Sequence, residues 1–504
     1  MTLQKSVMTK YQYQDLRDWI KMVADFGELR VLKGADWNLE IGAITEVFQR
    51  PQHWSDQARP CFLFDEIKDY PTGFRVLSGA LSSPRRLALT MGLDAIVSDR
   101  LELVKEVKEK LKHAGTILPR LVKKGPILEN IDEGNKVDLT KFPVPIWHEE
   151  DCGRYIGTGS ITITRDPDEG WVNIGTYRVM LHDEKTVGFY ISPGKHGRIH
   201  RDKYFERGEP CPVVVSIGHD PLLFLLGTKE VDQRVSEFDV AGGIKNKAID
   251  VINGMSGLPI PANAELVLEG EAVPGELREE GPFGEWTGYY ASSSRPEPVI
   301  RVKRVLYRDN PIILGAPPSK PPNENSFAGC TVRAAMIWNE LEKIGIPEIK
   351  GVYSHEAGGH RLFIVIAIRQ RYPGHARQAA LALSQCHSAA YLGRFIVVVD
   401  DDIDITSLDD VVWAMCTRCD PEYGIEILRR CWSGPLDPII PIERRGFSSR
   451  AIVDACKPYE RIKTFPKAVQ VSEKLRDHVF NKWYDAVKES TKHTQVVPNG
   501  LKHL

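Results

Sequence analysis

The sequence predicts a mixed α+β protein, that is, an α/β chain in three parts that ends in a helix. Two observations support this prediction. Runs of β-forming residues separated by Gly, Pro and Asp fill residues 126–315, and helical and strand-like segments mix before that stretch and alternate after it. A chain of 504 residues is also long enough to bury several hydrophobic cores.

Amphipathic helices mark the N-terminal α/β region, which we place at residues 1–125. The segment "YQDLRDWIKMVADFG" predicts a helix that stops at Gly27. Its apolar face consists of Leu16, Trp19, Ile20 and Val23. A second helix is expected in "SDRLELVKEVKEKLKHAG", where Asp99 and Glu102 have the spacing of a capping box.

Residues 126–315 are expected to form a mostly antiparallel sheet or barrel. The β-rich runs are, in order, "GSITITRD", "VNIGTYRVML", "VGFYI", "PVVVSIG", "ELVLEGEAV" and "VIRVKRVLY". Turn-forming residues separate these runs, and short strands joined in this way are typical of antiparallel sheets.

The C-terminal part, residues 316–470, begins with the Pro-rich connector "GAPPSKPPNENS" and then alternates helix and strand. The segments are "CTVRAAMIWNELEKIG", "HRLFIVIAI", "HARQAALALSQCHSA", "RFIVVVDDDID" and "LDDVVWAMCTRC". This alternation predicts an α/β layer with parallel strands.

A final amphipathic helix is expected within residues 471–504, in "SEKLRDHVFNKWYDAVKES", with Ser472 as its N-cap. Its apolar face carries Leu475, Val479, Trp483 and Ala486. Such a face needs a cover, so we expect the helix to build a homodimer or a higher homo-oligomer.

Composition and charge exclude several classes of function. A net charge of −2 gives no electrostatic attraction to nucleic acid or to an anionic membrane. The longest apolar runs are too short to span a membrane, and the N-terminal segment lacks the apolar core of a signal peptide. Nine cysteines, an odd number spread along the chain, favour reduced thiols. We therefore expect a cytoplasmic protein with no membrane or nucleic-acid partner.

The segment "EEGPFGEWTGYY", residues 279–290, places carboxylates on both sides of a Gly-Pro-Phe-Gly turn; we call it the acid loop. Pro282 fixes its own φ and Gly281 permits unusual backbone angles, which predicts a shaped loop. These residues alone leave three interpretations open: a solvated turn, a general acid/base pair of Glu280 and Glu285, or one wall of a metal or cofactor site. A glycosidase would use a similar pair, but the chain shows no eightfold βα repeat.

A second group of side chains offers mixed ligands for a hard cation. Asn173 lies in "NIGTYR", His196 in "SPGKHGRIH" and Glu237 in "SEFDVAGGI". An amide oxygen, an imidazole nitrogen and a carboxylate suit octahedral Mn²⁺ or Mg²⁺, with phosphate oxygens completing the shell, better than they suit zinc. Nothing in the local sequence brings the three together.

Other motifs predict less. In "HEAGGH", residues 355–360, the histidines have the wrong spacing for a zinc-protease helix. The lone "CTRC" pair lacks the further ligands of a zinc site and favours packing thiols. Neither a GxGxxG motif nor a P-loop lysine motif occurs in the sequence.

Seven motifs follow one another along the chain: "DCGRYIGTGSITIT", "NIGTYR", "SPGKH", "SEFDVAGGI", "EEGPFGEWTGYY", "VVVDDDID" and "WAMCTRCDP". In this order they resemble the UbiD family of reversible decarboxylases, which includes ferulic acid decarboxylase. The resemblance covers nearly the whole chain. It implies a central flavin-binding domain of split-barrel type that holds prenylated FMN through a divalent metal and K⁺.

The resemblance also implies roles for individual residues. The family's metal ligands fall on Asn173, His196 and Glu237. Its catalytic set falls on Arg178, Glu280 and Glu285. The expected cofactor-binding residues are these metal ligands together with Thr158, Thr176, Tyr177, Arg178 and Lys195. Backbone carbonyls near Ile174 and residues 226–229 would hold K⁺.

Decarboxylation leaves a carbanion-like centre, and a proton must replace the carbon dioxide that is lost. A carboxylic acid on a stiff loop can deliver that proton, and we expect Glu285 to do so. Arg178 and Glu280 are its expected partners, whereas Glu279 is expected to be solvated.

The chain departs from the ferulate branch near the substrate and the phosphate. Ser388 stands where that branch has a phosphate-binding lysine, so either Lys195 supplies the charge or the phosphate is bound more weakly. The expected substrate pocket consists of Ile191, Trp286, Gly434 and Leu436. Because Trp286 offers a stacking surface and Gly434 replaces a bulky side chain, we expect room for a ring system larger than cinnamate.

The expected activity is reversible, non-oxidative decarboxylation of an aromatic, heteroaromatic or α,β-unsaturated carboxylic acid. Prenylated FMN, Mn²⁺ or Mg²⁺, and K⁺ are the implied cofactors, and a flavin prenyltransferase would supply the flavin. Two alternatives remain open: a carboxylase within a larger complex, and a non-catalytic flavin-binding or assembly subunit. The intact Arg178, Glu280 and Glu285 argue against a non-catalytic role.

Overall fold

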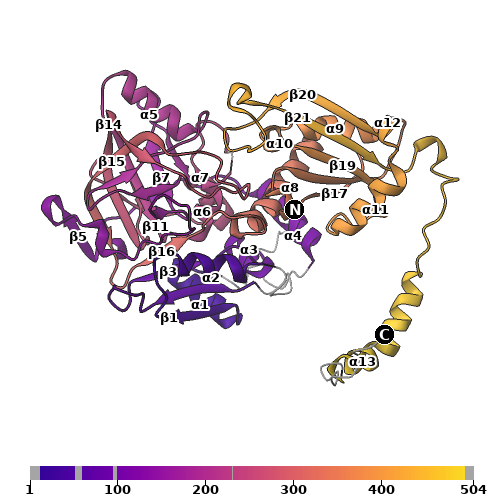
Figure 1. Cartoon of the computed structure of the whole chain (residues 1–504), viewed down its shortest axis with the longest axis horizontal. Helices are drawn as coiled ribbons and strands as arrows, with labels where there is room; N and C mark the ends of the chain where they lie inside the picture. Colours follow the sequence, from indigo (N-terminus) through magenta and orange to yellow (C-terminus); the bar gives the residue numbers. More distant parts are fainter. Residues whose placement is uncertain (1–11, 51–58, 95–98, 230, 494–504) are drawn as a thin grey trace, which may run out of the picture. The chain divides into compact units, whose positions relative to one another are not determined.

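The computed structural model describes residues 12–50, 59–94, 99–229 and 231–493 (Figure 1). The chain divides into two units, Met1–Cys456 and Lys457–Leu504. The larger unit holds a four-stranded, a nine-stranded, a three-stranded and a five-stranded β-sheet. The mixed α+β class expected from the sequence is therefore confirmed.

The N-terminal sheet has four strands in the order β1-β2-β3-β16. They are β1 (Leu29–Lys33), β2 (Cys61–Asp65), β3 (Arg75–Ser78) and β16 (Ile312–Gly315). β16 comes from the end of the β-rich part of the chain and pairs in parallel with β3. A strand from far along the sequence therefore completes the N-terminal sheet.

Four helices belong to the same region: α1 (Leu16–Asp25), α2 (Glu40–Phe48), α3 (Pro84–Met91) and α4 (Arg100–His113). Both helices expected from the sequence are confirmed. α1 buries its four predicted apolar residues and is followed by Gly27 at a φ of +74°. α4 begins after Asp99, whose side chain accepts a hydrogen bond from the Glu102 N–H at 2.7 Å.

The expected antiparallel sheet is also confirmed, and it curls into a half-barrel. Its order is β6-β9-β10-β15-β14-β11-β7-β8, with β5 on β15, and all of these pairings are antiparallel. The strands are β5 (Asn130–Glu133), β6 (Arg154–Gly157), β7 (Ile161–Arg165), β8 (Val172–Gly175), β9 (Val179–Leu181), β10 (Thr186–Gly188), β11 (Cys211–Ile217), β14 (Leu266–Glu280) and β15 (Arg295–Tyr307).

Smaller elements complete this part of the chain. A three-stranded sheet consists of β4 (Arg120–Leu121), β12 (Asp250–Asn253) and β13 (Pro259–Pro261). The helices are α5 (His196–Glu206), α6 (Pro221–Gly227) and α7 (Glu237–Lys245). The acid loop connects the two longest strands, because β14 ends at Glu280 and its partner β15 begins at Arg295. Glu279 and Glu280 thus belong to a strand rather than to the loop itself.

The C-terminal sheet differs from the expected parallel layer. Its order is β17-β18-β19-β21-β20, with β17 (Ile349–Ser354), β18 (Phe363–Ile368), β19 (Phe395–Asp400), β21 (Phe447–Ala455) and β20 (Ile425–Trp432). β18, β19 and β21 are parallel, but β17 and β20 run antiparallel at the two edges. Only the centre of the sheet is therefore parallel as predicted, because the edge strands are joined to their neighbours without a helical crossover.

Helices α9 (His375–Gln385), α10 (His387–Ala390), α11 (Leu408–Arg418) and α12 (Pro421–Gly424) accompany this sheet, together with the long α8 (Glu324–Lys343). α8 begins inside the expected Pro-rich connector, because Asn323 and Ser326 form a capping box there. One hydrophobic cluster runs from Leu16 in α1 through Phe327 in α8 to Val397 in β19. α8 therefore packs the C-terminal sheet against the rest of the larger unit.

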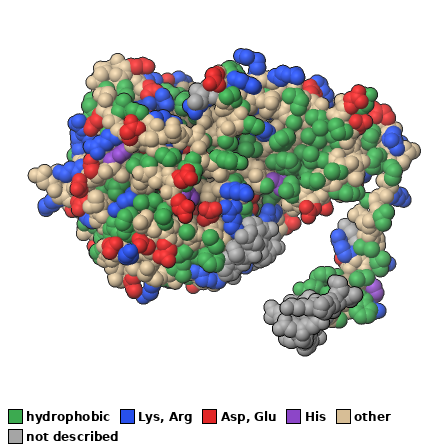
Figure 2. Space-filling view, viewed as in Figure 1, with side chains coloured by type: hydrophobic (Ala, Val, Ile, Leu, Met, Phe, Trp, Pro, Cys, Tyr) green, Lys and Arg blue, Asp and Glu red, His purple; other side chains and the backbone are tan. Residues whose placement is uncertain are grey.

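The smaller unit contains α13 (Glu473–His493), the helix expected at the C-terminus. Ser472 accepts a hydrogen bond from the Leu475 N–H at 3.3 Å, which confirms it as the N-cap. Leu475, Val479 and Trp483 are exposed on the single chain. In the larger unit, hydrophobic side chains also gather on one face over the C-terminal part (Figure 2). Exposed hydrophobic residues of this part include Ile425 and Ile427 in β20 and Phe447 in β21.

Candidate active site

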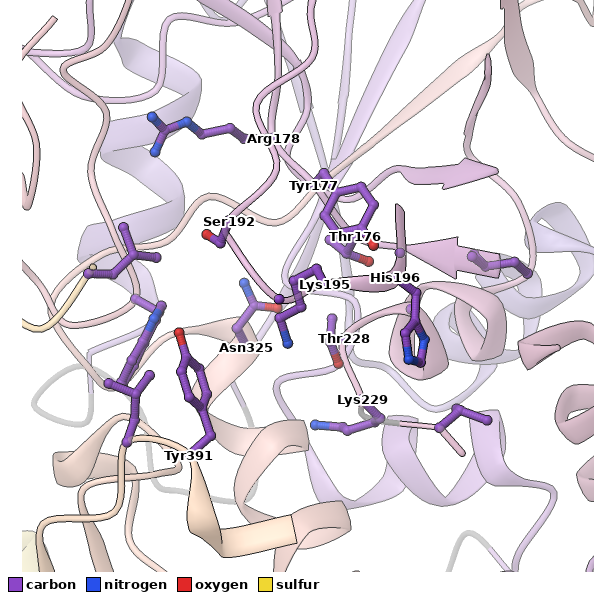
Figure 3. Close-up of a pocket in the computed structure, with 18 of the residues that line it drawn as sticks. Thr176, Tyr177, Arg178, Ser192, Lys195, His196, Thr228, Lys229, Asn325 and Tyr391 are labelled. Atoms are coloured by element: carbon purple, nitrogen blue, oxygen red, sulfur yellow. The ribbon is translucent and has the colours of Figure 1, made fainter. Parts of the chain in front are cut away.

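One large cavity opens in the larger unit, with a volume of about 520 Å³ (Figure 3). Both the β-rich part and the C-terminal part contribute to its lining. The predicted site residues that line it are Thr158, Asn173, Thr176, Tyr177, Arg178, Lys195, His196, Glu237, Glu285, Trp286 and Leu436. The fold therefore brings together residues that are dispersed along the sequence.

The three predicted metal ligands come from three different elements. Asn173 lies in β8, His196 is the first residue of α5 and Glu237 is the first residue of α7. A hydrogen bond of 2.7 Å from the Ile174 N–H to Glu237 Oε2 ties α7 to β8. The Tyr177 hydroxyl accepts hydrogen bonds from the Gly197 N–H at 3.2 Å and from Asn173 Nδ2 at 3.4 Å. The Asn173 amide nitrogen is thus engaged by Tyr177, so the side-chain oxygen is the atom that would bind a cation.

Two glycines make room for this arrangement. A Cβ atom at Gly175 would lie 2.2 Å from the Tyr177 hydroxyl oxygen, and one at Gly197 would lie 2.7 Å from the Tyr177 ring. Tyr177 is therefore folded into space that only glycine leaves free. Burial raises the pKa of Tyr177 to about 12, so its hydroxyl stays protonated at neutral pH.

The chemistry of the three side chains fits a bound cation. Glu237 is only 3% exposed, and no basic side chain in the described part of the chain forms an ion pair with it. Burial consequently raises the pKa of Glu237 to about 8. Burial, and secondarily the charge of Lys195, lowers the pKa of His196, which keeps the imidazole neutral and able to bind a metal. A divalent cation would offset the unfavourable free energy of burying the charged Glu237 carboxylate.

The segments expected to hold K⁺ also lie side by side. The Thr176 N–H donates a hydrogen bond of 2.9 Å to the Gly227 carbonyl, which joins the end of β8 to the end of α6. The Thr176 hydroxyl is buried and has no hydrogen-bond partner among the described residues. A polar group of this kind suits a ligand atom in the cavity.

The predicted catalytic residues form one ion cluster at the cavity wall. Arg178 follows β8 and donates to Glu280 from Nε at 2.8 Å and from Nη2 at 2.7 Å. Its third nitrogen, Nη1, donates to Glu285. Tyr155, which the sequence did not indicate, donates from its hydroxyl to Glu280 Oε1 at 3.0 Å. Glu280 does not line the cavity, so Arg178 stands between it and the open space.

One guanidinium therefore serves two buried carboxylates. Burial raises the pKa of Glu285 to about 7; the Arg178 charge opposes this shift and the Glu280 charge adds to it. Burial works against the charge on Arg178, but Glu285 and Glu280 outweigh it and hold the pKa of Arg178 above its usual value. The guanidinium carbon also lies 4.4 Å from the ring centroid of Tyr190. Arg178 is thus fixed in a charged state.

Further aromatic and basic residues complete the cavity lining. The rings of the predicted Trp286 and of His360 are 5.3 Å apart between centroids, and those of Tyr391 and Trp432, which no motif indicates, are 4.7 Å apart. Lys195 Nζ lies 5.6 Å from the Tyr391 ring, and Figure 3 shows both side chains in the same space. The other lining residues that sequence reasoning missed include Asn325, Lys229, Arg361 and His387.

Comparison with known proteins decides the family. Models of the N-terminal, Rift-related and C-terminal domains of 3-octaprenyl-4-hydroxybenzoate carboxy-lyase, the UbiD models, match residues 20–111, 120–321 and 326–455. The chain belongs to the UbiD family. It is therefore a carboxy-lyase, and the expected family and enzyme class are confirmed.

Relatives within the UbiD family cover almost the whole chain. Pyrrole-2-carboxylic acid decarboxylase of Pseudomonas aeruginosa is 32% identical over 461 residues, which is 88% of this chain and 91% of the relative. The UbiD-class enzyme HmfF of Pelotomaculum thermopropionicum, solved in complex with FMN, superposes with a TM-score of 0.80 at 27% identity. That comparison covers 92% of this chain and 98% of HmfF. An evolved dimeric form of HmfF was solved in complex with prenylated FMN (prFMN) and superposes with a TM-score of 0.77 at 26% identity. That comparison covers 91% of this chain and 97% of the matched HmfF chain.

Vanillic acid decarboxylase of Sedimentibacter hydroxybenzoicus superposes with a TM-score of 0.80 at 25% identity. The comparison covers 95% of this chain and 100% of the matched chain.

No helix in the described part of the chain is both long and apolar enough to cross a membrane.

Two of the expected pocket residues need correction. Among the described residues, Ile191 and Gly434 are absent from the cavity lining. Ile191 is 1% exposed and belongs to the hydrophobic cluster behind the site. A Cβ atom at Gly434 would lie 1.9 Å from the Tyr391 hydroxyl oxygen, so Tyr391 occupies the space that we expected the substrate to use. Gly434 therefore does not enlarge the pocket of this UbiD enzyme.

Ser388 takes no part in the cavity lining either. It is buried, donates to Glu340 through its hydroxyl, and accepts from Arg333 at its carbonyl oxygen. Two lysines reach the cavity elsewhere: Lys195, directly before α5, and Lys229, just after α6. The sequence predicts a role only for the backbone carbonyl near Lys229, as part of the K⁺ site, because no motif gives the Lys229 side chain a role.

Proposed function

We propose that the protein catalyses non-oxidative decarboxylation of an aromatic or heteroaromatic carboxylic acid in this cavity. The observation that carries the proposal is the cluster at the wall, in which Arg178 links Glu280 to the cavity-lining Glu285. A buried acid with a pKa raised to about 7 is suited to deliver a proton near neutral pH. A subunit that only assembled with others would have no use for this arrangement.

The cofactors proposed are prenylated FMN, Mn²⁺ or Mg²⁺, and K⁺. Asn173, His196 and Glu237 would hold the divalent metal, and the carbonyls beside Ile174 and Gly227 would hold K⁺. The first turns of α5 and α7, together with Lys195, favour a phosphate, because helix N-termini attract anions. When bound, prenylated FMN supplies the electron sink for loss of carbon dioxide. Structures of HmfF with FMN and with prenylated FMN support this assignment.

The protein's own residues would handle the proton. Glu285 gives its proton to the carbon that has lost carbon dioxide and recovers one from solvent afterwards. Arg178 keeps the Glu285 carboxyl in position and balances the negative charge that appears on it. The Glu280 carboxylate fixes the guanidinium from behind through two hydrogen bonds. In the reverse direction the same Glu285 carboxylate would accept the proton that carbon dioxide replaces, which is why the reaction is proposed to be reversible.

A flat ring is the substrate feature that the cavity favours. Trp286, Tyr391 and Trp432 line it, and aromatic side chains stack on rings or meet them edge-on. Relatives that act on pyrrole-2-carboxylic acid and vanillic acid support a five- or six-membered ring. Because Tyr391 fills the space beside Gly434, we propose a single ring rather than the larger system expected from the sequence.

The test is co-expression with a flavin prenyltransferase, purification, and a panel of single-ring carboxylic acids assayed for carbon dioxide release. Flavin and metal contents are measured on the same samples. Release with at least one acid, abolished in Glu285→Gln at equal flavin content, supports the function. No release with any ring acid from fully loaded protein would contradict it.

A further inference from the structure

Tyr155 contacts the catalytic carboxylates from behind the cavity. It lies in β6 and is fully buried, and its hydroxyl donates to Glu280 Oε1 at 3.0 Å. Its ring packs against Phe283 of the acid loop, with 4.1 Å between the ring centroids. Tyr155 is not among the described residues that line the cavity, so any effect of Tyr155 on the reaction must pass through another residue.

Hydrogen bonds distinguish the two glutamates that share Arg178. The Glu280 carboxylate accepts three hydrogen bonds, two from Arg178 and one from Tyr155. Among the described residues, the Glu285 carboxyl accepts a single one, from Arg178 Nη1. Donors that bind the ionised form of an acid stabilise that form. With one guanidinium between two buried acids, Glu285, which has fewer donors, is therefore the better place for the proton.

Tyr155 is able to remain a donor under all working conditions. Burial, followed by the negative charge of Glu280, raises the pKa of Tyr155 far above its usual value. The sulfur of Cys152 lies 3.3 Å from the Tyr155 hydroxyl and accepts the Gly281 N–H at 3.1 Å. The tyrosine hydroxyl is thus held between the start of the acid loop and the Glu280 carboxylate.

Other titratable groups face this cluster, but they act less directly. Asp151 accepts the Gly284 N–H at 3.0 Å. His182 and Arg295 interact with Glu280 and Glu285 through their charges, and Tyr190 packs on Arg178. In the described part of the chain, only Arg178 and Tyr155 donate a hydrogen bond to Glu280.

We propose that Tyr155 is a positioning residue: its hydroxyl holds the Glu280 carboxylate against Arg178 and thereby leaves the transferable proton on Glu285. The proposal rests on the function proposed above. It assigns a role in the reaction to a residue of β6 that neither touches the substrate space nor belongs to the Arg-Glu-Glu set.

The first test uses Tyr155→Phe without cofactor and requires no turnover. The variant keeps the ring and its contact with Phe283 but loses the donor. Infrared difference spectra between each protein and its Glu285→Gln counterpart report the proton on the Glu285 carboxyl across the pH range in which both stay folded. We expect the midpoint for loss of this proton to fall by about one pH unit, since Glu280 then lacks a donor and competes for the proton. An unchanged midpoint would overturn the proposal.

The second test uses the enzyme loaded with flavin and metal. Turnover should fall on the alkaline side, where Glu285 loses its proton. In Tyr155→Phe this alkaline limb should move to lower pH by about one unit. A uniform loss at every pH would indicate a merely structural role and reject the proposal.

Tyr204→Phe is the matched control. Tyr204 lies in α5, packs against the same hydrophobic cluster as Tyr155 and is not among the described residues that donate a hydrogen bond to Glu280. Its profile and its infrared titration should be those of the wild type. If no ring acid is decarboxylated by any of these proteins, the proposed function fails, but the infrared result still decides whether Tyr155 keeps the proton on Glu285.

Discussion

Glu280 and Arg295 are directly opposite each other where β14 ends and β15 begins. Backbone pairing therefore anchors both ends of the connection that carries the acid loop. Glu285 lies a few residues beyond this anchor, and its own N–H donates to the Tyr289 carbonyl at 3.1 Å. An acid held in this way keeps its position without support from the substrate, which is the preorganisation that proton transfer needs.

Glu285→Gln should retain the fold, the flavin and the metal but lose about 10²–10⁴-fold in decarboxylation, because the amide cannot deliver a proton. Glu279→Gln is the control, since Glu279 is exposed and bound to Ser294 rather than to Arg178. Turnover and deuterium incorporation into product are measured at equal cofactor content. Normal turnover by Glu285→Gln together with an inactive Glu280→Gln would show that the roles are reversed.

Activity should fall on the alkaline side of about pH 7. The pKa of Glu285 is raised to about 7, so the fraction that carries a proton decreases about tenfold for each further pH unit.

The same shift in the pKa of Glu285 affects the stability of the protein. The folded protein retains this proton between pH 4.5 and about 7 while the unfolded chain has released it, so this contribution to the free energy of unfolding declines as pH rises through that window. Glu285→Gln should remove that part of the pH dependence in chemical denaturation.

His196→Ala should lose the divalent metal and, with it, most of the flavin. The remaining Asn173 and Glu237 cannot complete the ligand set, and the phosphate then lacks its counter-charge. Metal analysis and flavin absorbance on purified protein measure the effect. His113→Ala, at an exposed position in α4, serves as the comparison and should keep both. Full metal and flavin in His196→Ala would refute the assigned ligand.

Gly434→Ala should disturb the cavity even though Gly434 does not line it. The added Cβ would lie 1.9 Å from the Tyr391 hydroxyl oxygen, so Tyr391 must move toward the substrate. We expect a loss of about 1–3 kcal/mol in stability and a higher KM for ring acids. Gly115→Ala is the control. A Cβ atom at Gly115 would meet no atom within 4 Å, so this variant should leave the KM unchanged. An unaltered KM in Gly434→Ala would indicate that Tyr391 does not border the substrate.

Deletion of residues 457–504 should convert a homo-oligomer into smaller species. The apolar face of α13 is exposed on the single chain, and the deleted residues form a unit of their own. Light scattering at micromolar concentration compares the full chain with the shortened one. A full-length protein that is monomeric under these conditions would contradict the expected homodimer.

Much of the cavity lining was predictable because several motifs, in their order along the chain, resemble those of the UbiD family. Asn173, Arg178 and Glu237 each lie in one of these motifs, and the cavity lining contains all three, although nothing in their local sequence brings them together. No motif gives Tyr155 or Tyr391 a role, since their roles depend on which residue lies opposite them in the fold. The absence of a side chain at Gly434 was visible, but the sequence does not reveal that another residue occupies the space.

The fold shows the same division. Hydrophobic periodicity and caps were sufficient to predict α1, α4 and α13. Strand direction at the edges of the C-terminal sheet was not predictable, because β17 and β20 have ordinary strand patterns whichever way they run. The start of α8 was missed since Pro-rich sequence masked the capping box at Asn323.

The return of β16 to the N-terminal sheet has a consequence during protein synthesis. Until the ribosome has passed Gly315, β3 is an edge strand with its backbone groups unpaired on one side. The N-terminal region therefore cannot reach its final form early, although most of its residues emerge first. Fragments that end before β16 are expected to aggregate, because the N-terminal sheet is complete only after β16 has been translated.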